Sequence, residues 1–260
     1  MNYLKSFARP IFDSKIGIFL RNFIGYKSIG FIFPRSVENY SCSDLFIWRT
    51  DNGYETVFRF SDIPSIYYKI KNSIVLFIFY DEHGVEIKKY EIIMNSSICE
   101  LKIDKKFLNM KSDLGSFVIF HLIDNEINEE IKITNRCYVG YKKNNSILSF
   151  MHGNIEAQYI DLKSENLQIR NDVAKIQFRT SKYHIQKNMS DYDYSELIFT
   201  NPCASDVWII VNGEKENLKP NSILIVRSEK TDIVRIESNM SMPRPIIFSY
   251  KGNYFDCHHG

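Results

Sequence analysis

Polar and aromatic side chains gather in one short stretch of the first quarter of the chain, at residues 43–55. The stretch reads SDLFIWRTDNGYE and carries Trp48, Arg49, Asp51 and Glu55 around a predicted turn. Aromatic faces stack on the apolar face of a sugar ring, while guanidinium and carboxylate groups bond its hydroxyls or a carboxylate. The stretch therefore predicts a carbohydrate site. The structural alternative is a turn held by an Arg–Asp pair beside core aromatic residues.

A second polar and aromatic group begins at Arg136 and ends at Asn154, with Tyr138, Tyr141 and His152 between them. Two predicted strands bring these residues toward a turn that contains the histidine and a glycine. Such a histidine can act as a general base, ligate a metal or hold a turn by hydrogen bonding. We expect these residues to extend the ligand site, with His152 as the catalytic proton-transfer group if the protein is an enzyme.

The C-terminal region adds Arg244 as a further expected ligand-binding residue and contains Asp256, Cys257, His258 and His259 just before Gly260. These last types can ligate a metal ion. Adjacent histidines point to opposite faces of a strand, so one ion would need a histidine from elsewhere in the chain. We therefore assign no metal ligand and no cofactor. A metal-dependent enzyme that uses His152 with the C-terminal histidines stays an alternative.

Several function classes lack their sequence signals. The chain has no GxSxG elbow, no phosphate-binding P-loop, no GxGxxG fingerprint and no HExxH motif, which disfavours common hydrolase and nucleotide-dependent mechanisms. A net charge of +2 predicts no nucleic-acid partner. The five cysteines are scattered and never form a CxxC pair, which disfavours a disulfide framework or a zinc ribbon.

An amphipathic helix is predicted for the basic segment 1–28. Its apolar residues recur at helical spacing, from Leu4, Phe7 and Ile11 onward, and basic residues lie off that stripe. The helix would dock on its own protein or, through residues 1–27, on a membrane surface or partner. Basic residues interrupt its apolar run, and no apolar stretch is long enough for a membrane span. We expect a cytoplasmic protein, with attachment to the inner membrane as the alternative.

From residue 29 the chain is a series of short apolar runs between turn signals, of which Asn212-Gly213 is the strongest. We predict an all-β fold with two antiparallel, jelly-roll-like β-sandwich halves, 29–153 and 154–260. The predicted strands are 29–33, 56–60, 74–80, 85–93, 98–103, 116–123, 136–142, 147–151, 156–162, 174–180, 196–200, 206–211, 222–227, 232–237 and 245–250.

Six stretches carry a family resemblance: SDLFIWRTDNGYETVF, DEHGVEI, GSFVIFH, NRCYVGY, SFMHGN and MPRPIIFSYKGNYFDCHHG. Across residues 40–260 the chain resembles a poorly characterised bacterial β-sandwich family that is encoded among genes for surface polysaccharide and unusual sugar biosynthesis. Residues 236–248 are also similar to the sensory rhodopsin transducer family, whose β-sandwich is suggested to bind small ligands such as sugars. Cys137 stands where the first family has glycine. Neither resemblance implies a reaction.

Together these observations favour a protein that binds or processes a sugar in the synthesis of a bacterial surface glycan, such as a capsule or O-antigen. The expected ligand is a sugar or nucleotide sugar, whose anionic group the arginines would hold. The alternatives are the metal-dependent enzyme and a non-catalytic membrane-peripheral or assembly factor. A second copy of the chain is a further candidate partner.

Overall fold

The structure is a computed structural model that describes Ile16 and residues 39–109, 113–123, 130–134, 137–153, 156–164, 167–171, 176–185, 189–229, 233–240 and 243–260. The described residues from Asn39 onward all belong to one compact unit. Apart from Ile16, the predicted N-terminal helix lies outside the described residues, as do Arg136 and Asn154. No described helix is long and apolar enough to cross a membrane.

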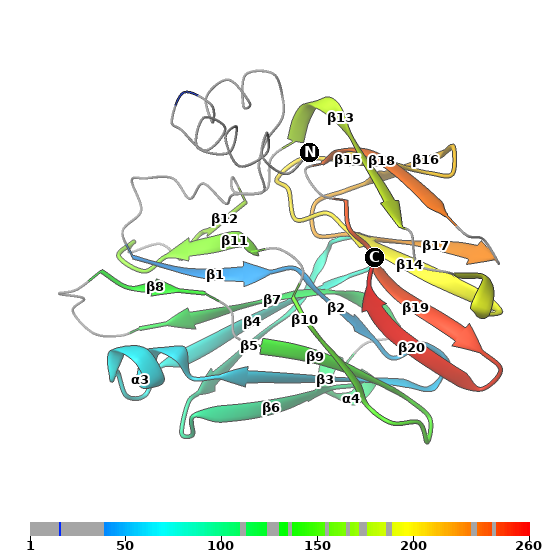
Figure 1. Cartoon of the computed structure of the whole chain (residues 1–260). Coiled ribbons are helices and arrows are strands. Elements are labelled where there is room, and N and C mark those ends of the chain that lie inside the picture. Colours follow the sequence, from blue (N-terminus) through cyan, green and yellow to red (C-terminus); the bar gives the residue numbers. More distant parts are fainter. Residues whose placement is uncertain are drawn as a thin grey trace, which may run out of the picture. The chain divides into compact units, whose positions relative to one another are not determined.

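The described chain is all-β, as predicted, with short helical turns between its strands (Figure 1). The elements in chain order are β1 (Tyr40–Asp44), β2 (Phe46–Arg49), η1 (Asp51–Gly53), β3 (Tyr54–Ser61), α3 (Ile63–Tyr68), β4 (Ile74–Asp81), β5 (Glu86–Ile93), β6 (Ile98–Ile103), α4 (Lys105–Leu108), β7 (Leu114–Leu122), β8 (Lys132–Ile133), β9 (Cys137–Lys143), β10 (Ser149–His152), β11 (Glu156–Asp161), β12 (Ile169–Arg170), β13 (Ile176–Ile185), η2 (Met189–Asp191), β14 (Tyr194–Thr200), β15 (Val207–Val211), β16 (Glu214–Leu218), β17 (Ile223–Glu229), β18 (Val234–Met240), β19 (Ile246–Lys251) and β20 (Tyr254–His259).

Hairpin signals in the sequence correspond to hairpins in the structure. Residues 81–84 connect β4 and β5, and Asn212-Gly213 connects β15 and β16. Asn212 and Gly213 have φ angles of 51° and 99°, which are the positive values that a type I′ turn requires at both positions. Apolar and polar residues alternate along β6, and its described bounds match the predicted strand 98–103. Local turn chemistry and period-two patterning therefore define much of the fold.

The described strands form five four-stranded sheets, with the orders β12-β11-β1-β8, β10-β9-β3-β6, β13-β18-β15-β16, β17-β14-β19-β20 and β2-β7-β4-β5. Neighbouring strands are antiparallel, except that β1 runs parallel to β8. Hydrogen bonds connect strands within each sheet, and the sheets pack through their side chains.

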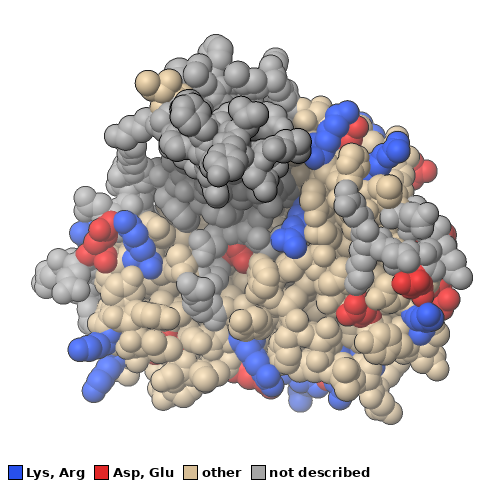
Figure 2. Space-filling model, in the orientation of Figure 1, with Lys and Arg blue, Asp and Glu red and all other residues tan. Residues whose placement is uncertain are grey.

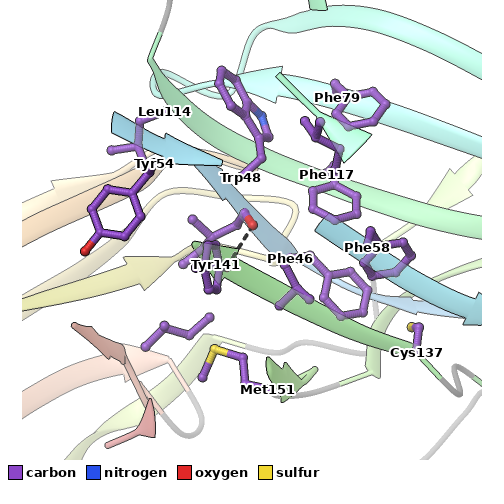
Figure 3. Packing of buried hydrophobic residues seen from close by; sticks show 14 of the residues in the cluster. Phe46, Trp48, Tyr54, Phe58, Phe79, Leu114, Phe117, Cys137, Tyr141 and Met151 are labelled. Carbon is purple, nitrogen blue, oxygen red and sulfur yellow. Dashed lines mark hydrogen bonds between the residues drawn. The ribbon is translucent and has the colours of Figure 1, made fainter. Parts of the chain in front are cut away.

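The largest apolar cluster lies where three of these sheets meet. Phe46 of β2, Phe58 of β3 and Phe117 of β7 are buried there with their rings in contact (Figure 3). Ile198 of β14 and Phe248 of β19 belong to the same cluster, so this core contains residues from both sides of position 153. Burial of such side chains supplies about 1.5–3 kcal/mol each, which is the main force that holds the sheets together.

Two smaller clusters cover the outer faces of this assembly. Leu76 and Phe120 of the β2-β7-β4-β5 sheet pack with Ile160 of β11. Leu197 of β14 faces Ile209 of β15 on the other side of the β17-β14-β19-β20 sheet. Because both faces of these central sheets are buried, β4 and β7 are apolar along nearly their whole length.

β1 and β2 form an almost continuous stretch that serves two sheets. β2 pairs with β7, whereas β1 leaves β7 and pairs with β11. Two serine hydroxyls replace the hydrogen bonds that this departure removes. Ser43 Oγ accepts a bond from the Ile119 amide at 2.9 Å, and Ser41 Oγ accepts one from the His121 amide at 2.9 Å. Arg49, the last residue of β2, is held by its pairing with Leu114 of β7.

Candidate functional site

A groove lies between the β9–β10 hairpin and the β19–β20 hairpin. It has a volume of about 1080 Å³ and is lined by residues 143–150 and 252–256, which we call the hairpin groove. In Figure 1 both hairpin tips project to the same side of the described unit. One hairpin comes from each of the two predicted halves, so residues far apart in the sequence share this groove.

The first hairpin turns at Lys143–Ser146. Asn144 adopts a left-handed φ of 50°, which asparagine tolerates better than most residues. The Ser146 amide donates to the Lys143 carbonyl at 2.9 Å, and the Lys143 amide donates to Ser146 Oγ at 3.0 Å. The Asn144 amide also donates to the Gly53 carbonyl at 2.8 Å. The turn is therefore anchored to η1.

The second hairpin turns at Gly252-Asn253. Gly252 has a φ of 56° and donates its amide to Asp193 Oδ2 at 2.8 Å. The Asp193 amide in turn donates to the Tyr250 carbonyl at 2.7 Å. The loop that precedes β14 therefore holds this hairpin in place, so both walls of the groove are fixed by hydrogen bonds.

β10 and β20 run alongside each other and bring the two hairpins together. Cys257 Sγ lies 3.5 Å from Met151 Sδ, and His259 Nε2 lies 3.1 Å from the His152 carbonyl oxygen. Both contacts lie near the C-terminal ends of β10 and β20, so the two strands run in the same direction. Their N-terminal ends therefore lie side by side, and each of these ends adjoins its hairpin tip. The groove follows from this pairing of edges.

The groove presents exposed aromatic and apolar surface among amide side chains. Tyr254 is 56% exposed and Ile147 is 77% exposed. Asn144, Asn145 and Asn253 also line the groove. A side-chain amide both donates and accepts hydrogen bonds, as a sugar hydroxyl does. On the visible face, charged side chains lie in small groups among uncharged residues (Figure 2). The groove thus combines exposed aromatic and apolar surface with hydrogen-bonding amides, and Lys143 and Asp256 add charged groups to its lining.

Beside the groove lies a polar cluster that we call the Arg49 network: the buried residues Arg49, Tyr54 and Tyr250 and the partly buried residues Asp51 and Glu196. Arg49 is 1% exposed, and its Nε and Nη2 donate to the two Asp51 carboxylate oxygens at 2.8 and 2.7 Å. Its Nη1 donates to Glu196 at 2.9 Å and to Tyr250 Oη at 3.2 Å. All three guanidinium nitrogens are therefore engaged within the protein.

Aromatic residues enclose the Arg49 network. The guanidinium carbon of Arg49 lies 4.0 Å from the Tyr54 ring centre and 4.6 Å from that of Phe248. Tyr54 Oη donates to Tyr250 Oη at 2.9 Å, and Tyr250 Oη donates to Glu196 at 2.6 Å. Because Glu196 is 147 residues from Arg49, the network joins distant parts of the described chain.

Burial and the contacts among its members together set the protonation of the Arg49 network. Burial opposes the charge of Arg49, but its hydrogen bond to Asp51 and the nearby acidic groups outweigh this and raise the pKa of the guanidinium. Burial also raises the pKa of Tyr54 and of Tyr250 above the ordinary value, and the positive charge of Arg49 only partly opposes this. Arg49 is charged and both phenols are neutral at physiological pH, which matches their hydrogen bonds.

The remaining predicted residues of the first stretch lie away from the groove surface. Trp48 is fully buried and donates its indole N–H to the Tyr80 carbonyl at 3.0 Å. Glu55 lies on the surface and pairs with Lys102 at 3.1 Å. The stretch is thus divided between the core, the Arg49 network and the outer surface.

The two predicted tyrosines of β9 lie on opposite faces of their strand. Tyr141 is fully buried and donates its hydroxyl to the Ile47 carbonyl at 2.9 Å, a bond drawn in Figure 3. Tyr138 is 55% exposed and does not line the hairpin groove. The alternation of side chains along a strand separates them.

His152 is exposed and lies at the far end of β10 from the hairpin groove. Its ring centre is 4.6 Å from that of His259. Burial, and then the nearby charge of Arg244, lowers the pKa of His259 to about 4, so its ring is neutral at pH 7. Arg244 donates from Nε to the Gly260 carbonyl at 2.8 Å. No set of three or more metal-ligating side chains is found among the described residues.

Several groove residues are absent from the site predicted on sequence, namely Lys143, Asn144, Asn145, Asn253 and Tyr254. The signal for the first three was the polar run KKNNS between two predicted strands, which is typical of a hairpin tip. The sequence offers no comparable signal that this tip faces residues more than a hundred positions later.

The chain matches no protein-family model, and no curated protein matches its sequence. Its function is therefore inferred from the geometry of the site.

Proposed function

We propose that this protein binds a saccharide in the hairpin groove. The observation that carries the proposal is the exposed ring of Tyr254 beside the asparagine side chains of two hairpins. An aromatic face stacks against the C–H face of a pyranose, and the surrounding amides bond its hydroxyls. A drug-sized or disaccharide-sized ligand fits a pocket of about 300–1,000 Å³, which is the scale of this groove.

Fixed walls also support the proposal. A binding site loses less free energy on binding when its side chains are already ordered. Backbone bonds to Gly53 and Asp193 hold the two hairpin turns, and the Arg49 network lies directly beside them. The groove is thus preorganised by residues that need not touch the ligand.

The wider setting of this proposal comes from the family resemblance of residues 40–260. On this proposal the two halves, 29–153 and 154–260, are jelly-roll-like sandwiches, each of which supplies one hairpin to the groove. The ligand is a sugar or nucleotide sugar of bacterial surface-glycan synthesis, and the protein acts in the cytoplasm.

Binding measurements with two matched tyrosine variants test the proposal. Tyr254 and Tyr138 are 56% and 55% exposed, but only Tyr254 lines the groove. An oligosaccharide panel first identifies a ligand by thermal shift, and calorimetry then gives its Kd. Tyr254→Ala is expected to weaken binding about tenfold, because a stacked aromatic contact is worth about 1 kcal/mol beyond its buried area. Tyr138→Ala is expected to leave the Kd unchanged.

Two outcomes would contradict the proposal. One is the absence of binding to any neutral or charged saccharide by the wild-type protein. The other is an equal loss of affinity in Tyr254→Ala and Tyr138→Ala, which would place the ligand elsewhere or reflect a general loss of structure. Unfolding curves of both variants check that each remains folded.

A further inference from the structure

We infer that the hairpin groove prefers an anionic saccharide and that Lys143, which the sequence did not single out, holds its charged group. This inference rests on the proposed function, since it specifies the ligand class of the same groove. The carboxylate of an acidic sugar and the phosphate of a sugar phosphate are both negatively charged, and both accept hydrogen bonds from an ammonium group. Arg49 and Lys143 are two cations near the groove, and they differ in whether their N–H groups are available to bind a ligand.

Arg49, the cation that the sequence favours, is already engaged. Its nitrogens donate to Asp51, Glu196 and Tyr250, and its guanidinium is 1% exposed. A ligand could reach it only by displacing a bidentate carboxylate, which would leave a charge inside the protein without its partner. The protein therefore uses this cation internally.

Lys143 occupies the boundary between the Arg49 network and the hairpin groove. It lines the groove, and its ammonium group lies 4.7 Å from the Tyr250 ring centre and 5.4 Å from that of Tyr54. A ring face attracts an ammonium ion but does not use its N–H groups as a carboxylate would. The three donors of Lys143 therefore remain for a ligand.

Some lysines elsewhere on the surface are already engaged by carboxylates. Lys102 pairs with Glu55 at 3.1 Å, Lys182 pairs with Glu237 at 3.2 Å, and Lys105 pairs with Asp113. Within the part of the chain that the structure describes, Lys143 forms no ion pair. Arg49 hydrogen-bonds both carboxylates of its network, Asp51 and Glu196. The ammonium group of Lys143 faces ring surfaces at the edge of the groove instead of a carboxylate.

One acidic side chain, Asp256, also lines the groove. Tyr192 Oη donates to Asp256 Oδ2 at 3.3 Å, and His258 Nδ1 lies 3.6 Å from the same oxygen. The carboxylate thus has partners within the protein. Lys143 and Asp256 differ in charge, so a single anionic group on a ligand would be attracted to Lys143 and repelled by Asp256.

The test compares ligands that differ only in charge. The probes are oligosaccharides containing glucuronate, galacturonate or sialate beside their carboxyl-reduced forms, and glucose 1-phosphate beside glucose. We expect the wild-type protein to bind the anionic member of a pair about tenfold more tightly, which is the effect of one charge-assisted hydrogen bond. The carboxylate and phosphate pairs show which anion is preferred.

Matched lysine variants locate this preference. Lys143→Gln should remove it and leave the affinity for the neutral member unchanged. Lys142→Gln removes the same charge one position earlier on β9, where the side chain points to the opposite face of the strand, and should retain the preference. Equal wild-type affinity for both members of every pair, or an intact preference in Lys143→Gln, would overturn the inference while leaving saccharide binding standing. Failure of all saccharides to bind would overturn the proposed function and this inference with it.

Discussion

The Arg49 network and the hairpin groove contain similar residue types, but the fold uses them in opposite ways. The network combines an arginine, two carboxylates and two tyrosines, all of which bond one another inside the protein. The groove holds Tyr254, Lys143 and several asparagines at an accessible surface. The first region therefore stabilises the contact between distant strands, and the second is available to a ligand.

Whether such a cluster can bind a ligand depends on its burial and on whether its polar groups already form hydrogen bonds with one another. A charged group taken out of water needs partners, and Arg49 has a full set of them. Lys143 lies only a short distance away but faces ring surfaces rather than carboxylates. Residue type alone does not separate these two cases.

The largest effect is expected from removing the centre of the Arg49 network. Arg49→Ala leaves Asp51, Glu196 and Tyr250 without their shared donor, and we expect the free energy of unfolding to fall by about 3–5 kcal/mol. Arg59 provides the control, because its ion pair with Glu100 at 2.6 Å is about half exposed on both sides. Arg59→Ala should cost no more than about 1 kcal/mol.

Urea unfolding of both variants gives these values. A loss in Arg49→Ala as small as that in Arg59→Ala would mean that the network contributes little to stability. The contrast between the two regions would then lose its physical basis.

A smaller effect is expected when only a phenol is removed. Tyr250→Phe deletes the hydroxyl that bonds Glu196, Arg49 and Tyr54, and should cost about 1.5–3 kcal/mol because two of these partners are charged. Tyr254→Phe makes the same change in the groove and should alter stability by less than about 0.5 kcal/mol. Equal effects in both variants would remove the distinction between the regions.

The same pair gives a pH dependence of known sign. Burial raises the pKa of Tyr250 in the folded protein, while an unfolded tyrosine ionises near its ordinary pKa of about 10. Above that pH the unfolded state has fewer bound protons than the folded state, so the free energy of unfolding falls as pH rises. Tyr250→Phe should make this fall less steep, whereas Tyr254→Phe should follow the wild type. Unfolding curves measured at a series of alkaline pH values provide the check.

Much of the fold could be predicted because its signals are local. The alternation of apolar and polar residues in 98–103 specifies a strand. The turn residues Asn212-Gly213 specify a hairpin. Neither signal depends on contacts with distant parts of the chain. β16 gave no such signal, since its residues Glu214–Leu218 are mostly exposed and polar. β2 is short, and all of its residues are buried, so it lacks the alternation of apolar and polar residues that predicts a strand.

The candidate site was harder to predict because it depends on contacts between distant strands. Arg49 and Asp51 were singled out as ligand-binding residues, and only the approach of Glu196 and Tyr250 shows how fully Arg49 is engaged. In the same way, the tip at Lys143 becomes part of a groove only because β10 lies beside β20. No spacing within the sequence encodes that neighbour directly.

The most direct test of saccharide binding in the hairpin groove is an NMR titration of the wild-type protein, with backbone amides assigned. The ligand is the tightest-binding oligosaccharide from the panel. Saccharide binding in this groove predicts that amide shifts change at 143–150 and 252–256, while those around His152 and Tyr138 stay in place. Shifts that instead concentrate at His152, His259 and Arg244, or that are absent at saturating oligosaccharide, would contradict it.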